Sequence, residues 1–158
     1  MKTILVVCTA NICRSPMAAG LLRARLKDDE AHRDWRVVSA GTWASEGRLP
    51  SAYGVAEMDE RGIDIRAHRS RSLSAELMEK ADLVLVMTRN HAEALSVAFP
   101  DQDHKVYVLS EMVGEAYNIS DPYGGTRLEY SYIAQELEQL INEGYERIVS
   151  LAEETSDP

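Results

Sequence analysis

Short apolar segments alternate with helical patterns along the chain, and this alternation is the strongest constraint on its fold. The segments at 3–7, 35–40, 83–87 and 105–109 have the length and β-branched content of buried strands. Helical patterns follow the first three, and a long amphipathic helix begins near Thr126. Strands separated by helices form parallel sheets. We therefore predict an α/β fold with a doubly wound, flavodoxin-like parallel sheet, in a single domain spanning residues 1–158.

Local signals set the predicted ends of these elements. Pro16 opens the first helix, and Gly62 ends a second helix over residues 50–61. Thr88 or Asn90 caps the helix that stops at Pro100. On the last helix Tyr130 and Tyr132 are expected to pack against the protein, and residues 153–158 are expected to form a frayed acidic tail.

Composition favours one ordinary core in a cytoplasmic protein. The chain has 158 residues, of which 45% are hydrophobic. The apolar run before Cys8 is too short for a signal peptide, and no stretch approaches the length of a membrane span. Two cysteines, Cys8 and Cys13, are too few for a disulfide scaffold, so we expect two thiols in a reducing compartment. The net charge of -9 argues against nucleic-acid binding, so any phosphate recognition must be local.

The segment from Cys8 to Pro16 lies between the first strand and the first helix. A loop at this point can direct successive backbone N–H groups at a phosphate, with the helix N-terminus adding its positive end. Arg14 supplies a planar fork for two phosphoryl oxygens and keeps its charge throughout a reaction. The same environment favours Cys8 as a thiolate, to which Ser15 can donate a hydrogen bond. Asn11 tolerates the left-handed backbone that a tight loop requires.

A thiolate that attacks phosphorus needs a proton donor for the leaving group. Asp121 is the best-placed candidate, because it lies in the turn-rich segment 119–125 before the last helix. The same carboxylate can then activate the water that hydrolyses a phosphocysteine. Cys8, Arg14 and Asp121 are therefore the predicted catalytic residues.

These residues resemble the low-molecular-weight protein tyrosine phosphatase family, whose hallmarks are Cys-x-Gly-Asn-x-Cys-Arg-Ser-Pro after the first strand and Asp-Pro-Tyr or Asp-Pro-Phe late in the chain. Further similar segments are Ser39-Ala40-Gly41, Ala81-Asp82-Leu83, Met87-Thr88 and His91. The resemblance implies a four-stranded parallel sheet flanked by helices, of the phosphotyrosine protein phosphatase I type. It also implies hydrolysis of phosphoproteins without a metal or other cofactor.

The resemblance extends to the substrate site and to one departure from the family pattern. It implies phosphate binding by the loop residues and a pocket mouth formed from two other loops: Thr9, Ala10, Asn11, Ile12, Cys13 and Ser15, with Trp43 and Tyr123 at the mouth. Cys13 matches the second thiol that protects the nucleophile as a disulfide during oxidation. Ala10 replaces the family's glycine, at a cost of about 1 kcal/mol if that position has positive φ.

Single residues of this pattern also have simpler interpretations. Without the rest of the pattern, Cys8 would be interpreted as a small buried hydrophobic residue and Asp121 as a turn residue. A zinc site is disfavoured because the four histidines are scattered without ligand spacing. The family's arginine phosphatases tend to carry Thr where this chain has Ile12, so Ile12 favours phosphotyrosine, while the segment 121–126 resembles the arginine branch.

Two other functions and the expected partners complete the hypothesis. Arsenate reduction would need cysteines after Cys13, and the chain has none. A non-catalytic phosphate-binding or redox-sensing module is the remaining alternative. The expected partners are phosphoproteins and a tyrosine kinase or its targets, with the chain a monomer or weak oligomer that contacts neither membrane nor nucleic acid.

Overall fold

The computed structural model describes residues 1–154 and contains one four-stranded sheet. Its strands are β1 (Thr3–Cys8), β2 (Arg36–Gly41), β3 (Leu83–Val86) and β4 (Val106–Val108). They lie in the order β2-β1-β3-β4, and every neighbouring pair is parallel. The predicted α/β class and parallel sheet are confirmed. The register pairs Cys8 with Gly41, so the carboxyl ends of β1 and β2 meet at the same edge.

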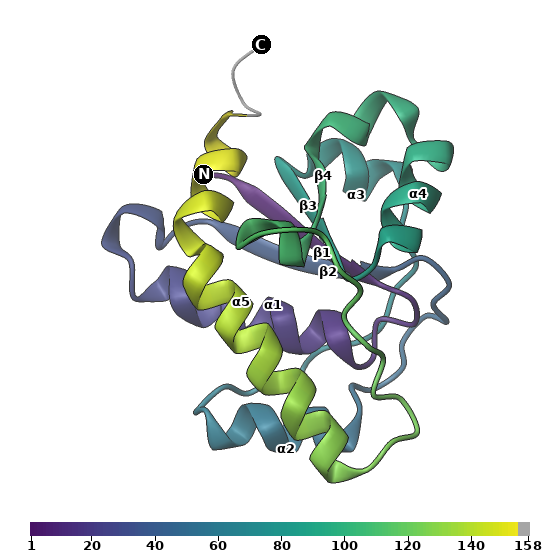
Figure 1. Cartoon of the computed structure of the whole chain (residues 1–158), viewed down its shortest axis with the longest axis vertical. Helices are drawn as coiled ribbons and strands as arrows, with labels where there is room; N and C mark the ends of the chain where they lie inside the picture. Colours follow the sequence, from purple (N-terminus) through teal and green to yellow (C-terminus); the bar gives the residue numbers. More distant parts are fainter. Residues whose placement is uncertain (155–158) are drawn as a thin grey trace.

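Helices cover both faces of this sheet (Figure 1). The long α5 (Arg127–Glu154) packs with α1 (Arg14–Lys27) and α2 (Ala52–Glu60) on one side. The short α3 (Ala75–Lys80) packs against β1 on the other side, and α4 (Arg89–Ala98) against β3 and β4. Three 3₁₀ turns complete the description: Glu30–His32, Pro100–Lys105 and Leu109–Met112. No helix within residues 1–154 is long and apolar enough to cross a membrane.

The central strand β1 contributes to two hydrophobic cores because successive side chains point to opposite faces of a sheet. Ile4 and Val6 join the core beneath α1 and α5, whereas Leu5 and Val7 join the core beneath α3 and α4. All four side chains are at most 1% exposed. Burial on both faces explains why β1 is an uninterrupted apolar run in the sequence.

Several element ends differ from their predictions. The first helix begins at Arg14, before Pro16, so the end of the Cys8 loop is already helical. Thr88, rather than Asn90, caps α4, because its hydroxyl accepts the backbone N–H of His91 at 3.1 Å. Helix α3 was not predicted. At its six residues it is too short to show a helical period.

The end of the last helix also corrects the sequence-based expectations. The predicted tail is partly helical, since α5 continues through Glu154, and residues 155–158 lie outside the described part of the chain. Tyr130 is buried as expected, but Tyr132 is 63% exposed, so the prediction that it packs was wrong. Tyr132 lies two positions after Tyr130, on a different side of the helix.

Candidate active site

The segment from Thr9 to Cys13 forms a tight loop between β1 and α1, and its shape depends on Asn11. Asn11 has φ 60° and is the one non-glycine residue with positive φ among residues 1–154. Asparagine adopts this left-handed conformation more readily than most residues. Ala10 does not have positive φ, so it carries none of the strain that the family's glycine would otherwise relieve. The departure at Ala10 therefore leaves the loop backbone unstrained at that position.

Asn11 is also the structural centre of the loop. Its Nδ2 donates to Ser15 Oγ at 2.8 Å and to Ser39 Oγ at 3.0 Å, and its Oδ1 accepts the backbone N–H of Arg71 at 3.0 Å. Its carbonyl oxygen accepts a hydrogen bond from His68 Nε2 at 2.8 Å. Burial lowers the pKa of His68, which keeps the ring neutral. The buried Asn11 side chain thus ties the loop to β2 and to the segment around residue 70.

Cys8 is 3% exposed, and its Sγ lies 3.0 Å from Ser15 Oγ. Ser15 Oγ already accepts a hydrogen bond from Asn11, so its own proton is free to be donated to the sulfur. A donated hydrogen bond favours the thiolate over the thiol. This contact is compatible with the predicted role of Cys8 as the nucleophile, which stays a prediction.

Arg14 is 4% exposed and has one guanidinium donor without a partner. Its Nη1 donates to the carbonyl oxygen of Ile119 at 2.9 Å. Its Nη2 lies 3.4 Å from Thr9 Oγ1 and 3.5 Å from Asp121 Oδ2. Its buried Nε finds no acceptor among the described residues. An unpaired buried donor is costly, and a phosphoryl oxygen would satisfy it.

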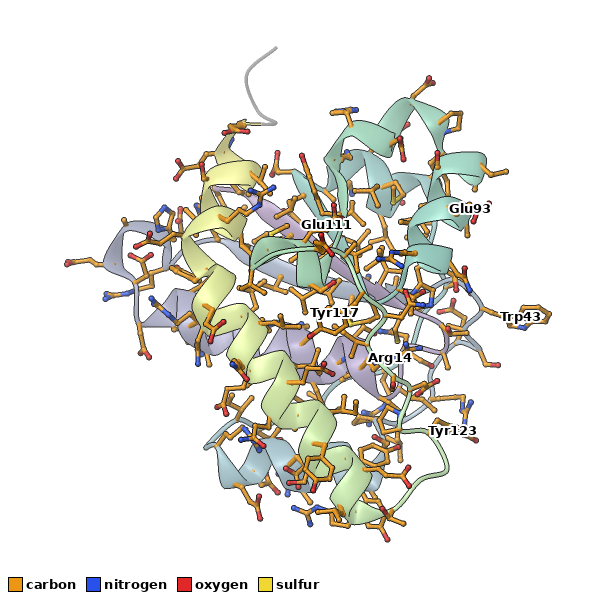
Figure 2. The ribbon with its side chains drawn as sticks, viewed as in Figure 1. Arg14, Trp43, Glu93, Glu111, Tyr117 and Tyr123 are labelled. Carbon is orange, nitrogen blue, oxygen red and sulfur yellow. The ribbon has the colours of Figure 1, made fainter. Side chains whose placement is uncertain are left out.

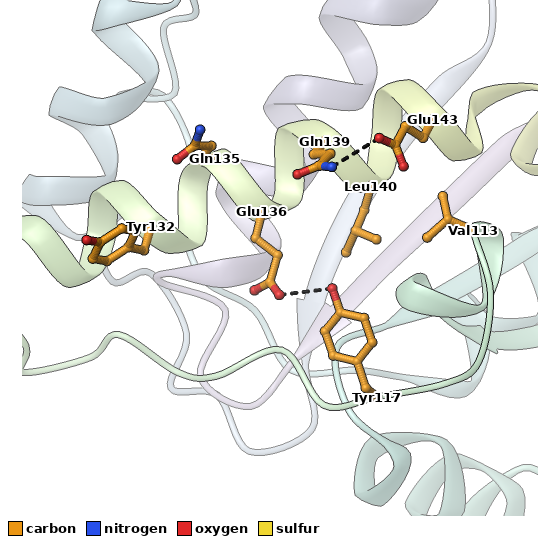
Figure 3. Close-up of a pocket in the computed structure, with 8 residues that line it drawn as sticks. All are labelled: Val113, Tyr117, Tyr132, Gln135, Glu136, Gln139, Leu140 and Glu143. Carbon is orange, nitrogen blue, oxygen red and sulfur yellow. Dashed lines mark hydrogen bonds between the residues drawn. The ribbon is translucent and has the colours of Figure 1, made fainter.

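Asp121 lies beside Arg14 but remains partly open to solvent, with 44% of its side chain exposed. Its Oδ1 accepts the backbone N–H of Tyr123 at 3.1 Å, which leaves Oδ2 facing Arg14. The preceding residues are anchored on both sides. Ile119 N donates to the carbonyl oxygen of Met87 at 3.0 Å, and Tyr117 OH donates to Glu136 of α5 at 2.9 Å (Figure 3). These contacts anchor the segment before Asp121 to Met87, directly after β3, and to α5.

The two aromatic residues predicted at the pocket mouth are both strongly exposed. Trp43 is 86% exposed and points away from the protein, while Arg14 lies within it (Figure 2). The loop of Trp43 is nevertheless joined to the catalytic loop, because Trp43 N donates to the carbonyl oxygen of Thr9 at 2.9 Å. Tyr123 is 62% exposed and lies two residues after Asp121. Both side chains are accessible to a substrate, and their contact with one stays a prediction.

Ile12 and Cys13 face the core, with 4% and 3% of each residue exposed. The Cys13 Sγ lies 3.2 Å from the hydroxyl of Tyr130, and burial raises the pKa of the Cys13 thiol. Any phosphate contact by these two residues would therefore come from their backbone N–H groups. Tyr130 reaches the site from α5, a contact between distant segments that no local sequence pattern indicated.

Sequence reasoning also gave no role to His91. Only 7% of this residue is exposed, and its Nε2 lies 2.9 Å from Thr9 Oγ1. Within residues 1–154, the structure has no group of three or more His, Cys, Asp or Glu side chains arranged to hold a metal ion. The site described above contains a thiol, a guanidinium and a carboxylate, from Cys8, Arg14 and Asp121.

The loop between Cys8 and Arg14 follows β1 at the carboxyl edge of a parallel α/β sheet. A cysteine and an arginine at such a place are typical of cysteine-dependent phosphatases. The family model described as "Low molecular weight phosphotyrosine protein phosphatase" matches residues 3–154. The chain belongs to this family of metal-independent protein phosphatases, which confirms the predicted family, fold and enzyme class.

Three known proteins illustrate the similarity. The chain is 42% identical over 123 residues to the probable low molecular weight protein-tyrosine-phosphatase EpsP of Ralstonia solanacearum, covering 78% of this chain and 79% of the relative. It is 38% identical over 146 residues to a protein-arginine-phosphatase of Geobacillus stearothermophilus, covering 92% and 95%. The crystal structure of a low molecular weight protein tyrosine phosphatase from T. tengcongensis superposes with TM-score 0.87 at 39% identity, covering 93% and 99%.

Proposed function

We propose that this phosphatase hydrolyses phosphotyrosine in proteins through a phosphocysteine intermediate. The observation that carries the proposal is the buried, unpaired Nε–H of Arg14, within the loop that begins at Cys8. A phosphoryl group in the loop would occupy that donor together with Nη2, in the bidentate geometry that arginine favours. The loop N–H groups from Thr9 to Ser15 supply the remaining donors.

In the first step, the Cys8 thiolate attacks phosphorus, and a P–S bond forms as the P–O bond to tyrosine breaks. Asp121 transfers its proton to the departing phenolate oxygen. Arg14 stabilises the charge that spreads over the equatorial oxygens in the transition state. The 3.5 Å distance between Arg14 Nη2 and Asp121 Oδ2 supports the proposal that the two residues act on the same phosphoryl group.

In the second step, the Asp121 carboxylate takes a proton from water, which attacks phosphorus. The P–S bond breaks, inorganic phosphate forms, and Cys8 leaves as a thiolate. Ser15 supports the sulfur in both steps, because its hydroxyl is 3.0 Å away and its acceptor position is occupied by Asn11. The two steps thus use one acid–base residue in opposite directions.

Phosphoarginine is the second candidate substrate, and one specific observation favours it. The similarity to the protein-arginine-phosphatase of G. stearothermophilus covers 92% of this chain. Ile12 opposes it, because a side chain that lacks a hydroxyl occupies the position where arginine phosphatases tend to carry Thr. Both substrates require the same loop, so the two candidates differ in leaving group rather than in mechanism.

The proposed setting follows from the phosphoprotein substrates that the family implies. We propose that the partners are the targets of a tyrosine kinase, or the kinase itself. A cytoplasmic location is supported by the two free thiols, Cys8 and Cys13. A single domain over residues 1–158 and a monomer or weak oligomer remain predictions.

The test compares phosphotyrosine and phosphoarginine peptides with wild type, Cys8→Ser and Asp121→Ala in metal-free buffer. We expect Cys8→Ser to lose at least about a thousandfold in kcat, and Asp121→Ala about a hundredfold or more. Asp101→Asn, which alters an exposed carboxylate in the turn Pro100–Lys105, is the matched control and should equal wild type. Faster phosphoarginine turnover would overturn the substrate, and an active Cys8→Ser would overturn the mechanism.

A further inference from the structure

His91 is a buried histidine that the reaction described above does not use. It lies in the first turn of α4, where its backbone N–H donates to the capping hydroxyl of Thr88 at 3.1 Å. This cap fixes the start of the helix and directs the ring toward the catalytic loop. Nε2 lies 2.9 Å from Thr9 Oγ1, whereas the buried Nδ1 finds no partner among the described residues. The ring therefore has one polar contact, and that contact is with the catalytic loop.

Thr9 connects His91 to the proposed phosphate clamp. The Thr9 hydroxyl lies 3.4 Å from Arg14 Nη2, and the guanidinium can only donate. Thr9 Oγ1 must therefore present a lone pair to Arg14. It can do so with either tautomer of His91, because the hydroxyl donates to an unprotonated Nε2 or accepts from a protonated one and keeps a lone pair in both cases. The His91 contact restricts rotation of the Thr9 side chain and so fixes the direction of that lone pair.

We propose that His91 is a positioning residue for phosphoryl transfer, which holds Arg14 Nη2 in its catalytic orientation through the Thr9 hydroxyl. The inference rests on the proposed role of Arg14 as the phosphate clamp. Arg14 has a second anchor, since its Nη1 donates to Ile119 O at 2.9 Å. One anchor leaves the guanidinium free to pivot about that bond, whereas two anchors fix its plane and leave Nε for a phosphoryl oxygen.

The ionisation of His91 agrees with this role. Burial, followed by the positive charge of Arg14, lowers the pKa of His91 to about 4, although Asp121 acts in the opposite direction. The ring is therefore neutral at neutral pH. A neutral ring can restrain Thr9 without placing a second positive charge beside Arg14, which a lysine at this position would do.

Two amide substitutions separate this role from simple packing. In Gln the amide nitrogen can reach the place of the histidine Nε2, whereas in Asn it can reach only the place of Nδ1. His91→Gln therefore keeps a polar group near Thr9 Oγ1, and His91→Asn removes it. Thr9→Val deletes the hydroxyl at similar volume. Glu93→Gln, on the exposed side of the same helix, is the matched control (Figure 2).

We expect His91→Asn to lower kcat by about tenfold or more, with KM changed by less than about threefold, because Arg14 acts mainly on the transition state. His91→Gln should recover kcat to within about threefold of wild type, and Glu93→Gln should equal wild type. In the Thr9→Val background, His91→Asn should have almost no further effect on kcat, because the hydroxyl that transmits its effect is absent.

Three results would overturn the inference: equal losses in the Gln and Asn variants, a change confined to KM, or losses that multiply in the double variant. Thermal unfolding of each variant reports the folded fraction. If His91→Asn does not fold, His91→Leu, which removes the polar group near Thr9 Oγ1, is compared in the wild-type and Thr9→Val backgrounds instead. Failure of the proposed function is distinguishable, since wild type would then turn over no phosphate ester or Cys8→Ser would stay active.

Discussion

Gly41 ends β2 directly beside the catalytic loop, and adding a single methyl group there tests how strictly the loop must be placed. A Cβ at residue 41 would lie 2.4 Å from the carbonyl oxygen of Thr9 and 2.8 Å from the Cβ of Ala44. Relief of the first contact to an ordinary 3.4 Å requires a displacement of about 1 Å. The question is which of the two backbones moves.

Hydrogen bonds hold the Gly41 backbone more firmly than the loop. Gly41 N donates to the carbonyl oxygen of Arg71 at 2.9 Å, and its own carbonyl oxygen accepts from Leu73 N at 2.9 Å. Thr9 is less constrained, because it lies in an exposed part of the loop, although its carbonyl oxygen accepts a hydrogen bond from Trp43 N. We therefore expect Gly41→Ala to displace Thr9, and with it the acceptor for Arg14.

The expected loss in kcat/KM is about a hundredfold, the typical cost of a misplacement near 1 Å in an active site. Overpacking should also cost about 1–3 kcal/mol of the free energy of unfolding, or about 2–4 °C in Tm per kcal/mol for a domain of this size. Aryl phosphate turnover and thermal unfolding measure the two effects separately.

Two other glycines provide matched controls. A Cβ at Gly114 would meet nothing within 4 Å, so Gly114→Ala should leave activity and stability near wild type. A Cβ at Gly144 of α5 would lie 2.5 Å from Met112 Cβ, so Gly144→Ala should lose stability while keeping kcat/KM. The reasoning is refuted if Gly41→Ala keeps kcat/KM within about threefold of wild type, or if Gly144→Ala loses as much activity.

Two further predictions concern stability and oxidation. Burial acts to lower the pKa of His32, but its hydrogen bonds to Asp29 and Glu153 outweigh burial and raise the pKa above the ordinary value of 6.5. The stability that these two contacts of His32 contribute is therefore fully present below pH 6.5 and is lost as pH rises through the raised pKa. In urea unfolding, His32→Gln should be more destabilising at about pH 5.5 than at about pH 8.5, and an equal difference at both would contradict the assignment. Peroxide inactivation should be reversed by dithiothreitol in wild type but not in Cys13→Ser, and full recovery of the variant would exclude Cys13 as the protecting thiol.

The sheet could be predicted from the sequence because its central strands are buried on both faces. Leu83–Val86 and Thr3–Cys8 are continuous apolar runs for this reason, and the helical patterns between strands leave few topologies open. The ends of the helices and strands could be predicted less accurately. Helix α1 begins at Arg14, two residues before Pro16, whereas the sequence predicts its start at Pro16.

Cys8, Arg14 and Asp121 could be selected as candidate catalytic residues because each has a local signal. Cys8 ends a strand, Arg14 begins a helix, and Asp121 lies in a turn, so their types and contexts indicate chemistry before any contact is known. His91 and Tyr130 have no such signal. Each is defined by one contact across the sheet or core, to Thr9 and to Cys13, and such pairings depend on tertiary structure alone.

Thr9 is held from two sides, by residues at the end of β2 and by His91 of α4. On the β2 side, the absence of a Cβ at Gly41 leaves room for the Thr9 carbonyl oxygen, and Trp43 N donates to it. On the α4 side, His91 restrains the Thr9 hydroxyl. Displacement of Thr9 from either side removes the same acceptor, Thr9 Oγ1, from Arg14. Once one substitution has removed this acceptor, the second has little left to remove. The losses in kcat for Gly41→Ala and His91→Asn should therefore be less than multiplicative, whereas substitutions that act through separate residues should combine independently.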